Sequence, residues 1–379
     1  MRVRTDWALF LTIVGMVSFG LVFVYSSSSV IAEQRYGEPS YFFLLRQTAA
    51  AILAFCALMT LAKYDYRRLK SPQWAFTCLG VVLVLLVTVY FADARTHRWL
   101  DLGPLNIQPS EFAKPALIVF LAYFVTQRAS DINGRHTVLP AAMAMVMLAG
   151  AVIVADLGTA VVLMGTAAAV FFVAGLERRF FHIAALVSVI LLTLSVLQKP
   201  YRLKRVLDFV DPGHRVLTRI DPGGVVLRYT SQATVTGDSG YQARQSRIAV
   251  GAGGLFGQGL MKGNQKLFYL PEAHTDFILA VVAEELGLFG ATLLLAGFVV
   301  ILWRGFRLYW IALDDFGRYL AVGVTAAVVL QAFINMSVVL GLAPTKGMPL
   351  PLISYGGSSL LSTMVSLGLL LSVSERARC

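Results

Sequence analysis

The chain has 379 residues, of which 57% are hydrophobic and only 14% are charged, and its mean hydropathy is +0.71. Soluble globular domains carry about 25% charged residues, so this composition excludes a soluble protein and predicts many membrane spans. The formal net charge of +11 does not indicate a nucleic-acid-binding protein, because the basic residues are scattered among short loops and form no single patch.

Ten apolar stretches are long enough to cross a bilayer, which takes roughly 20 apolar residues, or fewer where a helix tilts or breaks. We therefore expect an all-α, polytopic membrane protein with about ten transmembrane helices, forming a single membrane domain over residues 1–379. The first stretch is longer than a signal-peptide core and no cleavage site follows it, so we expect it to stay as a span. The ten expected spans are residues 7–25, 42–62, 74–91, 111–127, 138–154, 158–175, 181–198, 276–303, 319–341 and 350–374.

Lysine and arginine are concentrated in alternate loops and at both chain ends. Such positive charge marks the cytoplasmic side of membrane proteins, so we expect both termini in the cytoplasm. Residues 199–275, between the seventh and eighth expected spans, then form one large extracytoplasmic loop. This loop also carries many basic residues, but long loops cross the membrane regardless of their charge.

The large loop contains a glycine-rich segment, GAGGLFGQGL, near its end. Its residue order matches neither the P-loop nor the dinucleotide fingerprint. We expect close backbone packing at the membrane surface, and the alternative is a set of exposed N–H groups near a pyrophosphate.

A cluster of polar residues stands at the end of the large loop. Glu272, His274 and Asp276 directly precede an apolar run that begins at Phe277. An ionisable group at the edge of the hydrocarbon layer is usually paired, hydrated or functional, and we interpret Asp276 as the working carboxylate. The alternative is that Asp276 only caps the following helix. The spacing fits no zinc motif, and no serine-nucleophile motif is present, which disfavours a hydrolase of either kind.

Other polar residues in or beside the expected spans have structural and functional interpretations. Trp99 by itself is typical of an anchor at the membrane interface. Glu111 and Lys114 lie three residues apart on one helix face, so an ion pair that satisfies itself and a functional role are equally good interpretations. Asp156 is best explained as the cap of the next helix. Lys346 is the only cation in its loop, which is harder to explain structurally.

Six segments together resemble the SEDS family of membrane glycosyltransferases, which act in shape, elongation, division and sporulation. They occur in the family's order and span most of the chain. Two further details, VFVYSSSSVIA after the first span and the FVDP ending, are more similar to the FtsW division branch than to the RodA elongation branch. One departure is Ala155, where the family usually has proline. The six segments are RWLDLGPLNIQPSEFAK, ADLGTA, YRLKRVLDFVDP, GYQARQSRIAVGAGGLFGQGL, KLFYLPEAHTDFILAVVAEELGLFG and QAFINMSVVLGLAPTKGMPLPLISYGGSSLL.

The resemblance implies a peptidoglycan glycosyltransferase of the cytoplasmic membrane that polymerises lipid II into glycan strands and releases undecaprenyl pyrophosphate. It also implies a class B penicillin-binding protein as crosslinking partner, other division or elongation proteins, and the division septum as the location for the FtsW branch. The essential aspartate of the family matches Asp276. Its supporting positions match Trp99, Glu111, Lys114, Arg205, Gln242, Lys266, Glu272, His274 and Lys346.

The expected chemistry follows from this match. Asp276 would act as general base on the 4-hydroxyl of the acceptor GlcNAc. The pyrophosphate would be held by Lys266, Arg205, Lys346 or a divalent cation. This cation would be Mg²⁺ or Mn²⁺, with Asp276 as a candidate ligand. No organic cofactor is expected.

Two alternatives to a polymerase are a lipid II flippase and a non-catalytic scaffold for a partner's transmembrane helix. Polar groups in spans would serve a transporter equally well. The polar motifs cluster on the expected outer side, however, which favours chemistry over translocation. An intact PEAHTD segment argues against a scaffold, because binding alone does not require a positioned carboxylate.

Overall fold

The computed structural model describes residues 6–93, 96–101, 106–211, 216–217, 221, 224–231 and 239–377. Much of the middle of the expected large loop therefore lies outside the described residues. Each of the ten expected spans overlaps one helix. These helices are α1 (Trp7–Tyr36), α2 (Phe42–Lys63), α3 (Pro72–Ala92), α4 (Pro109–Gln127), α5 (Arg135–Ala155), α6 (Leu157–Val173), α7 (Arg178–Leu197), α12 (Ile278–Ile311), α13 (Asp315–Val339) and α14 (Gly357–Glu375). The last expected span, 350–374, however, begins in the loop before α14, and α1 continues past the expected end at residue 25 to Tyr36.

Within the described residues, eight of these helices are long and apolar enough to cross a membrane. The other two are α6, an apolar helix of 17 residues, and α4, which is 19 residues long. The prediction of an all-α, polytopic membrane protein is confirmed. A helix satisfies its own backbone hydrogen bonds, which is why apolar runs of this length fold this way in a bilayer.

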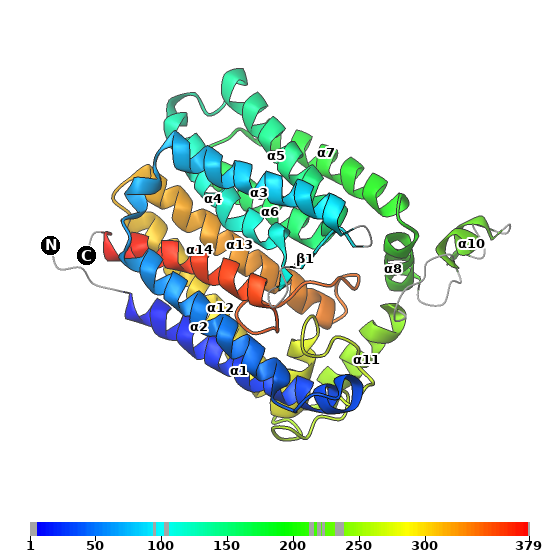
Figure 1. Cartoon of the computed structure of the whole chain (residues 1–379). Coiled ribbons are helices and arrows are strands. Elements are labelled where there is room, and N and C mark those ends of the chain that lie inside the picture. The colour runs from blue at the N-terminus through cyan, green and yellow to red at the C-terminus, as the bar shows by residue number, and fades with distance from the viewer. Residues whose placement is uncertain are drawn as a thin grey trace.

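Short elements connect the long helices. On the side of the bundle where α1 begins and α14 ends lie the 3-10 helices η1 (Tyr66–Leu69) and η2 (Ala129–Asp131). At the opposite end lie α8 (Pro200–Val210), α10 (Val225–Ser231) and α11 (Ser239–Ala252), as Figure 1 shows. A two-residue antiparallel ribbon joins β1 (Leu100–Asp101) to β2 (Asn106–Ile107), with Leu100 paired to Ile107.

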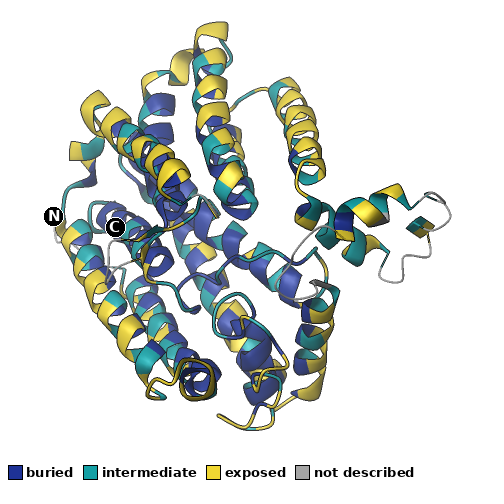
Figure 2. Cartoon of the chain, turned by 45° about the vertical axis from the view of Figure 1, so that its right-hand side comes forward, coloured by how far each residue is buried: buried dark blue, intermediate teal, exposed yellow. Residues whose placement is uncertain are grey.

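The core of the bundle lies around α4, α13 and α14. Nearly every residue of α4 from Pro109 to Val125 is buried, and α14 packs along α2. The outer helices present exposed apolar side chains, and in α7 only Ser195 is buried (Figure 2). Exposed apolar residues on the outside and buried ones in the centre are what a helix bundle in lipid requires.

The helix α12 is interrupted at Gly287, whose φ of 66° and ψ of −159° are not helical. The interruption leaves the carbonyls of Glu284 and Glu285 without helical partners. The backbone N–H groups of Gln258 and Gly259 donate to them, at 3.0 and 2.9 Å. The glycine-rich segment thus replaces the hydrogen bonds that the break removes.

Close approach to α12 explains the glycines of this segment. A Cβ at Gly253 would lie 1.8 Å from the carbonyl oxygen of Ala283, and one at Gly257 would lie 2.1 Å from that of Glu285. The expected backbone packing is therefore present. The N–H groups that bond to α12 are not available to a pyrophosphate.

Candidate active site

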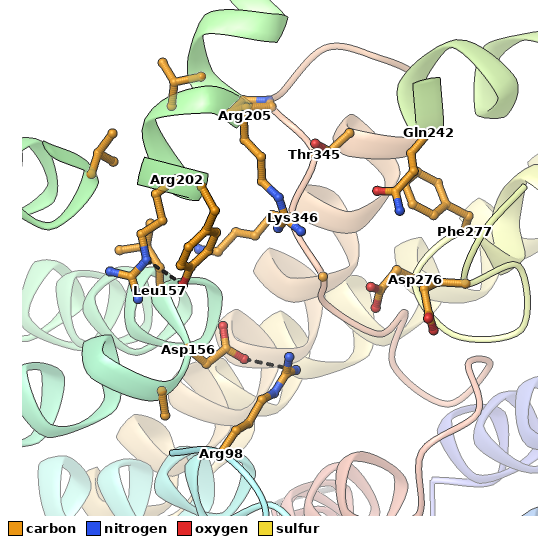
Figure 3. A pocket seen from close by; sticks show the side chains of 17 residues that line it. Arg98, Asp156, Leu157, Arg202, Arg205, Gln242, Asp276, Phe277, Thr345 and Lys346 are labelled. Carbon is orange, nitrogen blue, oxygen red and sulfur yellow. Dashed lines mark hydrogen bonds and ion pairs between the residues drawn. The ribbon is translucent and has the colours of Figure 1, made fainter. Parts of the chain in front are cut away.

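A pocket of about 320 Å³ opens at the end of the bundle where α8 and α11 lie (Figure 3). Its walls come from seven places in the chain: the segment before β1, the junction of α5 and α6, the helices α7, α8 and α11, the segment before α12, and the loop between α13 and α14. Its polar lining residues are Arg98, Asp156, Tyr201, Arg202, Arg205, Gln242, Glu272, Asp276, Thr345 and Lys346.

Five of the predicted site residues meet in this pocket. Arg205 comes from α8 and Gln242 from α11, while Glu272 and Asp276 precede α12 and Lys346 precedes α14. The fold therefore gathers side chains that are up to 141 positions apart, from 205 to 346, around one space.

Asp276 lies on the pocket wall, two residues before α12 begins at Ile278. No side chain caps this helix, whose N-cap residue is Phe277, so the helix-cap alternative for Asp276 finds no support. Burial raises the pKa of Asp276 to about 7, with Arg98 opposing the rise and the negative charge of Glu272 adding to it. A carboxyl group with a pKa near the working pH is suited to general base catalysis.

Glu272 belongs to the same wall and has an unusual backbone. Its φ is 57°, a left-handed conformation that is uncommon for a residue with a side chain. The hydroxyl of Thr275 donates to the Glu272 carboxylate at 2.9 Å. Strained backbone of this kind persists where the surrounding structure holds it in place.

In the described part of the chain, three cations of the pocket lack an anionic partner: Arg205, Lys346, and Arg202, which donates to Ser195 and to backbone carbonyls of α5 instead. Arg98 lies 3.6 Å from Asp156, but neither Arg205 nor Lys346 has an ion pair within 4.0 Å among the described residues. Figure 3 shows the Arg205 side chain extending from α8 toward Lys346, while the end of the Lys346 side chain lies beside Gly158, next to Asp156. Burial lowers the pKa of Lys346 to about 8, and the nearby Asp156 carboxylate opposes that shift. Unpaired cations in a half-enclosed pocket suit an anionic ligand.

Lys266 lies elsewhere. Its ammonium group is 2.6 Å from a carboxylate oxygen of Glu285 and donates to the hydroxyl of Ser26 at 2.9 Å, and the side chain is buried. Its charge is therefore already neutralised, and it does not line the pocket. The expected contact between Lys266 and a pyrophosphate finds no support in this geometry.

Glu111 and Lys114 form a buried ion pair at 2.7 Å inside the bundle, and Lys114 also donates to the side-chain oxygen of Gln331 at 2.5 Å. Neither residue lines the pocket. Of the two interpretations made from the sequence, the geometry bears out the ion pair.

Trp99 and His274 flank the pocket without lining it. Trp99 is 41% exposed beside the guanidinium group of Arg98, 5.7 Å from its ring centre, as an interfacial anchor would be. His274 packs between the rings of Phe43 and Tyr355, at 5.1 and 5.7 Å between ring centres, and burial lowers its pKa.

Sequence reasoning did not select three of the charged lining residues as site residues. Asp156 caps α6 as expected, by accepting from the N–H of Gly158 at 2.8 Å, but its carboxylate also faces the pocket. Arg202 lies one turn before Arg205 on α8, and this spacing was the available signal. Arg98 directly precedes Trp99. The family resemblance selected Trp99, and Arg98 was not selected.

Among the residues that the structure describes, no group of three or more His, Cys, Asp or Glu side chains could hold a metal ion. Asp276 and Glu272 nevertheless supply two carboxylates on one wall of the pocket. Mg²⁺ commonly binds through one or two carboxylates together with substrate phosphates, and this donor set fits that shared mode.

Comparisons with known proteins agree over the whole chain. Residues 6–379 match the family model described as "Cell cycle protein", which covers FtsW, RodA and SpoVE. The chain is similar to a probable peptidoglycan glycosyltransferase FtsW of Geobacter metallireducens, with 38% identity over 99% of this chain and 96% of the relative. It is also similar to stage V sporulation protein E of Bacillus subtilis, with 37% identity over 100% of this chain and 99% of the relative.

Solved structures show the same fold. A chain from a peptidoglycan synthase complex that coordinates polymerization and crosslinking aligns with a TM-score of 0.74 and 28% identity, over 98% of both chains. The rod shape determining protein RodA of Thermus thermophilus aligns with a TM-score of 0.68 and 26% identity, over 98% of this chain and 97% of RodA. With these matches over its full length, the chain belongs to the FtsW/RodA/SpoVE family of polytopic membrane proteins.

Proposed function

We propose that this protein is a peptidoglycan glycosyltransferase that polymerises lipid II at the outer face of the cytoplasmic membrane. The observation that carries this proposal is a carboxyl group with a pKa of about 7, Asp276, in one pocket with the unpaired cations Arg205 and Lys346. The names of the relatives support the reaction class.

In this mechanism Asp276 takes the proton from the 4-hydroxyl of the acceptor GlcNAc. The hydroxyl oxygen then attacks the anomeric carbon of the growing chain, and the bond from that carbon to the pyrophosphate breaks with inversion. The acceptor sugar occupies the place that water has in an inverting hydrolase. The proton ends on Asp276, and undecaprenyl pyrophosphate leaves.

The leaving pyrophosphate develops negative charge, which Arg205 and Lys346 are suited to stabilise. Both are pre-positioned cations in a space from which much of the water is excluded, where their interaction with an anion is stronger than in bulk water. A Mg²⁺ or Mn²⁺ ion, held by Glu272 or Asp276 and the pyrophosphate oxygens, would add to the same charge neutralisation.

The proposed orientation has both termini in the cytoplasm, the whole chain as one membrane domain, and residues 199–275 as its large outer loop. The start of α1 and the end of α14 lie at the end of the bundle opposite to α8 and α11, which supports this arrangement (Figure 1). A class B penicillin-binding protein is the proposed partner, since one structural relative comes from a complex that couples polymerization to crosslinking. The FtsW-named relatives favour septal synthesis in cell division over a RodA-type role in elongation.

The test is polymerisation of lipid II by the full-length chain, purified with its candidate penicillin-binding partner and resolved on a gel. Asp276→Asn keeps the shape of the side chain but cannot accept the proton, and we expect no polymer from it. Asp131→Asn, outside the pocket, is the matched control and should polymerise normally. Polymer from a folded Asp276→Asn variant would refute the base role. Translocation of lipid II by a wild type that makes no polymer would favour the flippase.

A further inference from the structure

The segment that carries Asp276 is held through three successive backbone carbonyls. The carbonyls of residues 274, 275 and 276 each accept one hydrogen bond from the last third of the chain. The donors, in that order, are the N–H of Tyr355 at 3.0 Å, the hydroxyl of Ser354 at 2.5 Å and the side-chain amide of Asn335 at 2.8 Å. Within the segment, the N–H groups of Thr275 and Phe277 both donate to the carbonyl of Glu272 at 3.2 Å, which forms a turn. The three contacts attach this turn to the last third of the chain.

Asn335 differs from the other two donors because it bonds to two segments at once. The same amide nitrogen also donates to the carbonyl oxygen of Met348 at 2.7 Å. Met348 follows Lys346 by two residues, in the loop that brings Lys346 to the pocket. Asn335 is 2% exposed on α13, a helix packed against α4, α6, α12 and α14. A rigid helix thus presents one buried side chain to both segments.

The two segments touch as a consequence. A Cβ placed on Gly347 would lie 2.8 Å from a carboxylate oxygen of Asp276, so any other residue here would displace the carboxylate. The backbone of Asp276 and the backbone after Lys346 are therefore linked through one side chain, and the carboxylate of Asp276 lies against Gly347.

We propose that Asn335 is a positioning residue for glycan polymerisation, which holds the carboxylate of Asp276 and the ammonium group of Lys346 in one arrangement around the substrate. This inference rests on the proposed function and deepens it. Asn335 is not among the residues that line the pocket, and it acts through the two backbone segments. Positioning matters because a displacement of about 1 Å at a reacting group can lower a rate by about 100-fold.

The variants are Asn335→Ala, which removes the amide, and Asn335→Leu, which has a similar volume but no donor hydrogens and no charge. We expect kcat on lipid II to fall about 10- to 100-fold while KM changes by less than about 3-fold, since the pocket cations remain. Polymerisation is measured with the full-length chain and its penicillin-binding partner, at saturating and at limiting lipid II.

A second measurement separates positioning from general stability. The ionisation of Asp276 depends on its burial and on the charged groups that face it, which are Arg98, Arg205, Glu272 and Asp156. A loosened segment admits water, so the low-pH limb of the rate profile should move to lower pH in both Asn335 variants.

The matched control is Ser372→Ala, at the far end of the bundle. The Ser372 hydroxyl is buried and bonds to the backbone of Tyr64 at 2.5 Å and of Tyr66 at 3.2 Å, so its loss also frees two backbone groups. It should lower thermal stability without moving the pH profile. If the Asn335 variants lose activity only in proportion to the folded fraction, with an unshifted profile like the control, the inference is overturned.

Two further outcomes are separable. Should Asn335→Ala not fold, Ser354→Ala removes the neighbouring bond to the carbonyl of Thr275, and it should show the same fall in kcat and shift in profile, to a smaller extent. Wild-type rates and profile in folded Ser354→Ala would then refute the inference. Polymer from Asp276→Asn would instead refute the base role of Asp276 in the proposed function, whatever Asn335 does.

Discussion

Replacing Gly347 by alanine tests the geometry of the base most directly. The added Cβ would lie 2.8 Å from a carboxylate oxygen of Asp276, about 0.6 Å short of the 3.4 Å at which ordinary van der Waals contact begins. The backbone at Gly347 does not have the positive φ that requires glycine, so alanine introduces no backbone strain. We therefore expect the carboxylate to move by about half an ångström, and kcat to fall about 10-fold, because a displacement of 1 Å can cost about 100-fold.

The assay is lipid II polymerisation alongside thermal unfolding in detergent. Stability should be unchanged or slightly higher, since Gly-to-Ala changes at compatible positions stabilise by about 0.4–1 kcal/mol through the unfolded chain. Gly80→Ala in α3 is the control, because its Cβ would meet nothing within 4 Å, and it should leave kcat unchanged. A fully active Gly347→Ala variant would show that the position of the carboxylate does not limit the reaction.

Three further predictions concern the pocket and its support. The rate of polymerisation should rise as pH passes about 7, where Asp276 ionises, and fall above about 8, where Lys346 loses its charge. A rate–pH profile that stays flat from pH 6 to 9 would contradict both assignments. Lys266→Met leaves the buried Glu285 carboxylate without its ion-pair partner and should destabilise the protein by about 3–5 kcal/mol. The double variant, Lys266→Met with Glu285→Gln, should regain most of the thermal stability. A stable but inactive double variant would assign Lys266 to the substrate instead. Gly257→Ala places a Cβ 2.1 Å from a carbonyl oxygen of α12 at a position with a φ of 77°. It should lower the free energy of unfolding by at least about 1–3 kcal/mol. An unchanged melting temperature would contradict the packing of the glycine-rich segment.

Hydropathy was sufficient to predict the ten long helices, because a bilayer imposes helix formation on any long apolar run. It could not predict the interruption of α12 at Gly287. That break depends on N–H groups of Gln258 and Gly259 that replace the lost helical bonds. A pattern within one segment contains no information on such distant partners. The glycine spacing did indicate close packing, though not against which element.

The candidate site was predictable in part for the same reason. The local cluster around Asp276 pointed to a working carboxylate, and the family resemblance added Arg205, Gln242 and Lys346, which the fold brings to the same pocket. The same resemblance also placed Lys266 among the expected site residues. Its partners, Glu285 and Ser26, lie 19 and 240 positions away, and only the folded chain shows that they neutralise it.

Charged side chains that stay unpaired in the fold therefore indicate the binding site better than the positions of charged residues in the sequence do. The guanidinium Nε of Arg205 is buried and has no hydrogen-bond partner in the described structure, and burial lowers the pKa of Arg205. Burying a cation without a partner is unfavourable, so a fold that retains one has gained something from it elsewhere. A pyrophosphate between Arg205 and Lys346 would satisfy both groups, and its negative charge would disfavour the ionised form of Asp276 beside it. Substrate binding would then raise the proton affinity of Asp276 at the step where it must accept a proton. In this way the cations that bind the pyrophosphate and the base that takes the proton act together.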